Sequence, residues 1–263
     1  VPVNTFPEFV SYSVRRLKVL CPSMGKARIA NVLCRAGLHL GSTTVRRMLK
    51  VTDRPKRPTP PRSTAAGRVV TAKRPNHVWH ADLSTVPTAL GFWVPWLPFS
   101  IPPIWPFCWF VAVVEDHFSR RVMGVAVFKK EPTSKAIRDF LGRAIAATGH
   151  APNHLISDKG TQFTEKGFPR WCRRRGIRHR FGAVGWYGSI AIIERLMRTL
   201  KSECTRRLVL VPFRRAEFVT ELNFWSRWYN VERPHETLAA RTPDEVYSHR
   251  RPACRSPRLE PRA

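Results

Sequence analysis

The sequence predicts an α/β domain that follows a small all-α module, and three observations support this fold class. Apolar residues recur at helical spacing over residues 11–50. Residues 51–75 are rich in proline, arginine and lysine, a composition typical of an extended linker. From residue 76 onward, short β-branched runs alternate with longer helical patterns. We therefore expect a helical module over residues 1–50, a linker over 51–75, an α/β domain over 76–250 and a basic tail over 251–263.

The first 50 residues have the pattern of a helix-turn-helix unit. Apolar residues at 14, 17 and 20 indicate one helix, and those at 29, 30 and 33 indicate a second. Ser42 or Thr43 can cap a third helix. In such units the last helix enters the major groove, so Arg46 and Arg47 are candidate DNA contacts. A helical bundle that only packs on the next domain is the alternative, and the start at Val1 also fits a truncated module.

The α/β region reads as five strands and four helices. Strands are expected over residues 78–86, 110–115, 121–128, 154–157 and 177–181. Helices are expected over residues 133–147, 168–175, 189–207 and 214–229. A turn over residues 116–119 joins the second and third strands.

Charge points to a polyanionic partner. The 263 residues include 46 Lys and Arg but 18 Asp and Glu, giving a formal net charge of +28. Neutralising phosphates releases counterions, so nucleic acid is the expected ligand. A ribosomal or membrane-surface protein is the alternative. The 43% hydrophobic content is enough to bury a core and excludes a disordered basic tail.

Cysteine spacing and hydropathy favour a cytoplasmic location. None of the six cysteines forms a C-x-x-C pair, so neither a zinc module nor a small disulfide scaffold is expected. No signal peptide is evident at the N-terminus. Residues 90–114 lack charge and are long enough to span a bilayer, but their five prolines prevent a continuous helix. We expect neither a membrane partner nor a small-molecule substrate.

Three carboxylates stand nearly alone in this basic chain. Asp82 is the only acidic residue between Arg54 and Val114, and Glu194 is the only one between Lys166 and Ser202. Asp158 directly follows the fourth expected strand, and 35 residues separate it from Glu194. Carboxylates surrounded by cations suit a metal-dependent phosphodiester enzyme, in which acids hold the metal and Lys and Arg hold the nucleic acid.

The helix expected over residues 189–207 presents Glu194 together with two cations. Apolar residues at 193, 197 and 200 share one side of that helix. Glu194, Arg198 and Lys201 fall on another side, at i, i+4 and i+7. A lone acid is usually a cap, a turn residue or a solvated side chain. The joint placement of Asp82, Asp158 and Glu194 favours a metal site that meets a phosphate backbone.

Three motifs together resemble the DDE integrase core of bacterial insertion-sequence transposases and retroviral integrases. They are HVWHADLS at 77–84, SDKGTQF at 157–163 and ERLMRTLKSE at 194–203, with the D,D-35-E spacing of the family. The stretches VEDHFSRR at 114–121, WYNVERPHETL at 228–238 and TPDEVY at 242–247 also resemble it. The resemblance covers about residues 74–250.

The resemblance implies a ribonuclease H-like fold, a mixed five-stranded sheet flanked by helices. It implies that Asp82, Asp158 and Glu194 bind two Mg²⁺ or Mn²⁺ ions and catalyse DNA cleavage and strand transfer. Arg198 and Lys201 match helix positions that contact DNA ends, and Lys159 lies inside the second motif. A homo-oligomer acting on element ends and target DNA, in a bacterial cytoplasm and nucleoid, is the implied context.

Two stretches depart from the family pattern. Residues 91–109 form a Pro- and Trp-rich insert, whose tryptophans either stack on unpaired bases or pack on the domain's own core. Residues 182–188 contain three glycines and are interpreted as a mobile loop beside the site, with Trp186 and Tyr187 facing DNA. Asp116, a fourth acid in the region, falls in a turn and is interpreted as structural.

Two other functions fit the same residues. One is a truncated or domesticated DNA-binding remnant without catalytic activity, which the missing initiator Met favours and the intact acid triad disfavours. The other is a nuclease of the same fold. The sequence specifies neither the terminal repeats, the target preference nor the oligomeric state.

Overall fold

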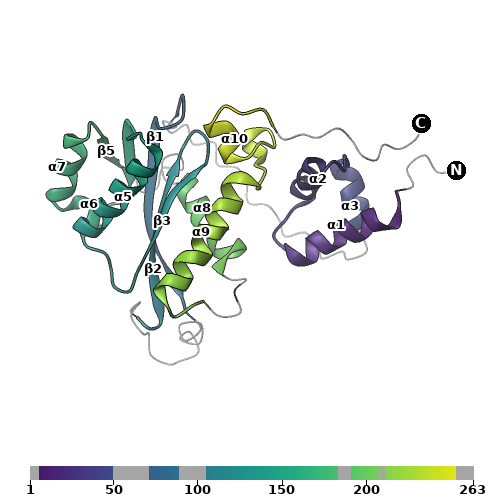
Figure 1. The fold of residues 1–263 in the computed structure, drawn as a ribbon, viewed down its shortest axis with the longest axis horizontal. Coiled ribbons are helices and arrows are strands. Elements are labelled where there is room, and N and C mark those ends of the chain that lie inside the picture. Colours follow the sequence, from purple (N-terminus) through teal and green to yellow (C-terminus); the bar gives the residue numbers. More distant parts are fainter. Residues whose placement is uncertain are drawn as a thin grey trace, which may run out of the picture. The chain divides into compact units, whose positions relative to one another are not determined.

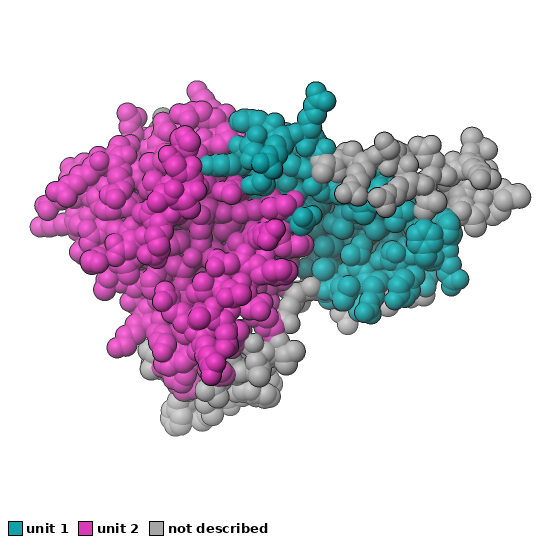
Figure 2. All heavy atoms as spheres, in the orientation of Figure 1, with its two compact units in different colours: residues 1–66, 232–263 teal, residues 67–231 magenta. Residues whose placement is uncertain are grey.

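The computed structural model of this chain describes residues 6–49, 71–88, 105–182, 191–205, 208 and 211–252. The chain divides into two compact units, residues 1–66 with 232–263 and residues 67–231, shown in two colours in Figure 2. Most of the expected linker, residues 91–104 of the expected insert, the glycine-rich loop after Gly182 and the tail from residue 253 lie outside the described residues.

The larger unit is built on one mixed five-stranded sheet, which confirms the expected fold class (Figure 1). Its strands are β1 (Val78–Pro87), β2 (Cys108–Asp116), β3 (Val122–Phe128), β4 (His154–Ser157) and β5 (Arg178–Phe181). The strand order is β3-β2-β1-β4-β5. Strands β1, β2 and β3 pair antiparallel, whereas β4 pairs parallel with β1 and with β5. A short turn therefore connects β2 to β3, and helical crossovers deliver β4 and β5.

Helices cover both faces of this sheet (Figure 1). They are α5 (Ser134–Thr148), α6 (Thr161–Thr164), α7 (Gly167–Arg174), α8 (Ala191–Glu203) and α9 (Arg215–Val231). A Cβ at Gly124 of β3 would lie 3.2 Å from the Phe140 ring of α5, so this glycine lets α5 lie close to the sheet. The next residue, Val125, packs against the cluster that contains α8 and α9. Because side chains alternate along a strand, α5 lies on one face and α8 and α9 lie on the other.

Tryptophans fill the core on the α8 and α9 face. Trp109 is fully buried, and its indole nitrogen donates a hydrogen bond to the carbonyl oxygen of Pro212 at 2.9 Å. Its ring contacts Trp105 at a centroid distance of 4.3 Å and Phe218 at 6.1 Å. For the described end of the insert, packing on the core is therefore the correct interpretation. None of the described helices is long and apolar enough to cross a membrane.

The smaller unit joins three N-terminal helices to a C-terminal segment. Its elements are α1 (Glu8–Leu20), α2 (Lys26–Arg35), α3 (Ser42–Leu49), η3 (Glu236–Leu238) and α10 (Pro243–Tyr247). Val10, Val14, Ile29 and Val45 are fully buried between the three helices. Helix α3 already includes Ser42, and the Val45 N–H bonds to the Gly41 carbonyl, so Gly41 stands where Ser42 or Thr43 was expected as the cap.

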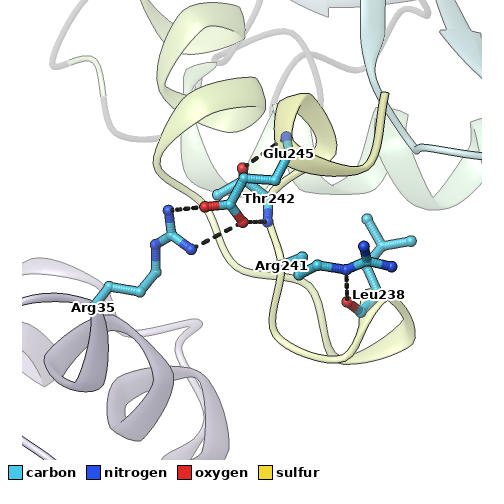
Figure 3. Close-up of polar contacts among 5 residues, drawn as sticks. All are labelled: Arg35, Leu238, Arg241, Thr242 and Glu245. Atoms are coloured by element: carbon cyan, nitrogen blue, oxygen red, sulfur yellow. Dashed lines mark hydrogen bonds and ion pairs between the residues drawn. The ribbon is translucent and has the colours of Figure 1, made fainter. Parts of the chain in front are cut away.

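A bidentate ion pair ties α2 to α10 (Figure 3). The Arg35 guanidinium donates to the two Glu245 carboxylate oxygens at 3.1 and 2.7 Å. Glu245 also accepts the Thr242 N–H at 2.9 Å and donates its own N–H to the Thr242 hydroxyl at 3.3 Å, which closes a capping box. The two charged side chains are only 16% and 10% exposed. Water therefore screens this pair less than it screens a surface ion pair.

We predict that Arg35→Ala destabilises the smaller unit by about 2 kcal/mol, because it removes the bidentate guanidinium from the buried Glu245 carboxylate. Hydrogen exchange should accelerate at the backbone amides of α2 and α10. Lys26→Ala is the matched control, since Lys26 is an exposed cation at the start of the same helix. Equal exchange rates in both variants would contradict the role of the ion pair.

Candidate active site

The sheet brings the two aspartates to the same level. Strands β1 and β4 run parallel with His80 opposite Ile156. Continuing that register by two residues sets Asp82, inside β1, beside Asp158, directly after the end of β4. Two residues 76 positions apart in the chain thus become lateral neighbours because of one strand pairing.

Helix α8 supplies the third carboxylate. Ile193, Leu196, Met197 and Leu200 are buried against the sheet, which fixes the rotation of the helix. Glu194, in the first turn, and Arg198 are exposed on the other side. Lys201 lies two turns after Glu194 and is half-buried. Its Nζ donates a hydrogen bond to the Ser84 hydroxyl at 2.6 Å. This bond pins α8 to β1 two residues beyond Asp82.

The pKa of Asp82 reports that the three acids act on one another. This pKa is raised from 3.8 to about 6. Burial is the largest cause, the charge of Asp158 is the second, and Glu194 adds a smaller increase. The Leu83 N–H, which donates to Asp82 at 2.9 Å, and the nearby Lys201 lower it. Negative charge is therefore concentrated where one strand, one strand end and one helix start meet. Such a site attracts a proton or a cation.

A buried histidine pair lies behind Asp82. His80 projects from β1 on the same face as Asp82, two residues earlier, and is fully buried. Its Nε2 lies 2.9 Å from Nδ1 of His117. Burial, then the charges of His117 and Arg120, lower the pKa of His80 to about 3. His80 is therefore neutral at pH 7 and adds no positive charge beside Asp82. Sequence reasoning assigned no role to it, although the i, i+2 spacing with Asp82 was visible.

Asp116 has a structural role. Its carboxylate accepts the Asn76 N–H at 2.8 Å, the Ser119 N–H at 2.8 Å and the Ser119 hydroxyl at 2.7 Å. These bonds tie the turn between β2 and β3 to the start of β1. These three donors belong to the backbone or to the turn itself, which fits the sequence interpretation.

The donor set suits a hard divalent cation, since it consists of carboxylates. Asp158 is half-buried, and its side chain accepts the Gly160 N–H at 3.2 Å. Within the described ranges, no three Asp, Glu, His or Cys side chains are grouped so that they could hold a metal ion. The charges of Asp158 and Glu194 thus act on Asp82, but the three side chains are not arranged around one metal position.

The predicted DNA contacts fall in both units. Arg198 and Lys159 are exposed in the larger unit, on α8 and directly after Asp158. Arg46 and Arg47 are exposed on α3 of the smaller unit. Lys201 differs from the other four, because its ammonium contacts Ser84 beside Asp82.

Comparison with protein families gives two consecutive matches. A model described as integrase core domain matches residues 72–186, and a second model with the same description matches residues 175–243. The chain belongs to the integrase core family. This match confirms the resemblance that the three motifs carry, and it covers every strand of the larger unit.

Two of the curated relatives that this chain matches are named transposases. It is 24% identical over 186 residues to the transposase for insertion sequence element IS904 of Lactococcus lactis subsp. lactis (strain IL1403), across 70% of this chain and 66% of that protein. It is 26% identical over 234 residues to the transposase for IS629 of Shigella sonnei, across 84% and 73%. A 39.2 kDa insertion element IS476 protein of Xanthomonas euvesicatoria matches over 39% of its length. The chain thus spans less than two thirds of two of these three relatives.

Solved structures share the fold. The HTLV-2 integrase catalytic core domain in complex with magnesium superposes with a TM-score of 0.50 at 20% identity, over 67% of this chain and 99% of that one. A simian T-cell lymphotropic virus intasome chain gives 0.52 at 21% identity, over 95% and 77%. The integrase core of this protein therefore has the ribonuclease H-like fold.

We predict that Asp82→Asn stabilises the metal-free protein at pH 7.5. Because folding raises the pKa of Asp82 from 3.8 to about 6, the folded state binds more protons than the unfolded state between these values. Unfolding free energy therefore falls as pH rises through this window, by about 3 kcal/mol in total. The amide removes this loss, so Tm should rise by about 5 °C at pH 7.5 and by much less at pH 4.5.

Asp139→Asn is the control, because Asp139 is an exposed carboxylate on α5 that pairs with Lys135. Its Tm should match wild type at both pH values. A lower Tm for Asp82→Asn at pH 7.5, measured in chelator by thermal denaturation, would contradict a pKa of Asp82 raised by burial and by the charge of Asp158.

Proposed function

We propose that this protein is a transposase that cuts DNA at the ends of a mobile element and joins those ends to target DNA. One observation carries the proposal. In an integrase core, the carboxylate of Asp82 is held beside Asp158 and near Glu194. Its raised pKa shows that the surrounding protein groups disfavour its negative charge, which a bound cation would stabilise. The names of the curated relatives support the same activity.

We propose that Asp82, Asp158 and Glu194 hold two Mg²⁺ or Mn²⁺ ions during the reaction. The carboxylate donors fit these metals, and the related HTLV-2 core was solved with magnesium. Bound divalent ions would supply the activation of water or of a 3′-hydroxyl and the stabilisation of the departing oxygen. Glu194 is exposed on the first turn of α8, so its side chain is free of core packing and can turn toward the two aspartates.

The chain's own residues then bind and orient DNA. We propose that Arg198, one turn beyond Glu194, holds a phosphate of the element end, and that Lys159 holds one beside Asp158. Lys201 is proposed to keep α8 seated on β1 through Ser84, so that Glu194 keeps its distance from Asp82. Arg46 and Arg47 on α3 are proposed to contact duplex DNA. This scheme needs no covalent protein–DNA intermediate.

We further propose that the active form is a homo-oligomer, because two element ends must be joined to one target. The HTLV-2 core is described in a trimeric form. The division into a DNA-binding helical module, a linker, a catalytic core over residues 76–250 and a basic tail also remains our proposal. A strand-transfer assay on pre-cut ends separates the alternatives, since a nuclease cleaves without joining and an inactive remnant does neither.

We predict that Glu194→Gln lowers Mg²⁺-dependent cleavage and joining by at least about 100-fold and leaves DNA affinity unchanged. The amide keeps the size of the side chain but loses the charge that binds a metal. Glu203→Gln on the last turn of α8 is the matched control and should retain activity. Gel assays of cleavage and joining, with affinity measured in Ca²⁺ on the same oligonucleotides, give both numbers. Near-normal joining by Glu194→Gln would refute the assignment.

We predict that Arg198→Ala weakens binding of an element-end duplex and lowers the slope of log affinity against log salt by about one unit, the loss of one phosphate contact. Lys135→Ala, an exposed cation on α5 across the sheet, should leave the slope unchanged. Fluorescence anisotropy over a salt series measures both. An unchanged slope for Arg198→Ala would show a solvated side chain.

A further inference from the structure

Seven cations cluster at one edge of the larger unit, apart from the acids. They lie on α7, on β5 and in the residues next to α7, and no acidic residue occurs between residues 166 and 181. We call this the β5–α7 surface: Lys166, Arg170, Arg173, Arg174, Arg175, Arg178 and Arg180. All seven side chains are exposed. Within the part of the chain that the structure describes, none of them is paired with a carboxylate.

Packing of α7 forces its cations outward. Phe168 and Cys172, one turn apart, are buried toward α5 and β5. Arg170 and Arg174, also one turn apart, therefore share a solvent-facing side. The Arg175 guanidinium lies 4.3 Å from the centre of the Trp171 ring, which holds this cation in place by a cation–π contact. A cation held before binding loses less side-chain freedom when a phosphate arrives.

The surface wraps around the edge strand toward the acid triad. Strand β5 is the last strand of the sheet (Figure 1). His179 turns toward α7, where its ring meets Phe168 at 5.0 Å. Arg178 and Arg180 alternate with it and so face the opposite side of the sheet. Arg180 pairs with Ile156, which pairs with His80, so Arg180 lies on the face that carries Asp82. The positive surface thus runs from the face of the triad, around β5, to α7.

Protection of an edge strand explains only part of this surface. Exposed cations on an edge strand prevent it from pairing with another chain. That explanation accounts for Arg178 and Arg180. It does not account for Arg170, Arg173, Arg174 and Arg175, which lie on α7 or directly after it. Like charges at this density repel one another, and a polyanion removes the repulsion.

We propose that the β5–α7 surface binds the phosphate backbone of target duplex DNA as it leaves the acid triad. Residues 166–181 contain no Ser, Thr, Asn or Gln. Contacts made by Lys and Arg to phosphates are independent of sequence, which suits target DNA more than a defined element end. The inference rests on the proposed transposase function for the origin of the duplex. The phosphate contact itself does not.

The first test measures binding without chemistry. The full chain carrying Asp82→Asn, with or without Arg170→Glu and Arg174→Glu, is titrated with a random-sequence duplex in chelator. The charge reversals should weaken binding at least about tenfold at 0.1 M salt. The control pair, Lys130→Glu and Arg227→Glu, reverses two exposed cations after β3 and on α9. Circular dichroism checks folding of each variant, and if the reversals unfold it, Arg170→Gln with Arg174→Gln is measured. Equal weakening in test and control variants would overturn the proposal and leave edge protection only.

The second test separates target from element end. With Asp82 restored, pre-cut ends and a plasmid target are supplied with Mg²⁺. Arg170→Glu with Arg174→Glu should lower joining to the plasmid while binding of the pre-cut end stays at the control value. Loss of end binding with random-duplex affinity intact would overturn the choice of target DNA. If wild type joins nothing, the transposase function fails, whereas the binding test still decides the phosphate contact.

Discussion

The parallel pairing of β1 with β4 is the constraint on which the candidate site depends. It sets Asp82 beside Asp158 and so forces two like charges together at the edge of a hydrophobic sheet. Burial and then the charge of Asp158 raise the pKa of Asp82 to about 6, and the neutral His80 behind it does not offset this rise. Core packing on both sides of β1 keeps the arrangement in place. The carboxylates stay close because the sheet holds them there against their mutual repulsion.

Helix α8 links this acidic centre to the core of the larger unit. Its buried side merges with α9 and the tryptophan-rich core, while its exposed side carries Glu194 and Arg198. Lys201 donates a hydrogen bond to Ser84 and so fixes α8 against β1. A single helix therefore transmits the geometry of the core to the third acid. Exposed cations also occur on the β5–α7 surface and, in the smaller unit, on α3, where water reduces their mutual repulsion.

Much of this organisation followed from local sequence pattern. Short runs with strand-like patterns predicted all five strands, and strand ends agree within about two residues. The isolation of Asp82 and Glu194 in a basic chain marked them as candidates before any fold was known. Short elements were missed: α6 and α10 span one turn each, too short for a helical period to register.

Sequence by itself determined the composition of the site, and tertiary structure decided its energetics. Acid types, their spacing and the apolar stripe of α8 are local properties that can be read along the chain. The raised pKa of Asp82, the role of Lys201 on Ser84 and the Arg35–Glu245 ion pair are not. Each joins residues far apart in the chain, and its strength depends on burial and distance, which only the folded packing sets.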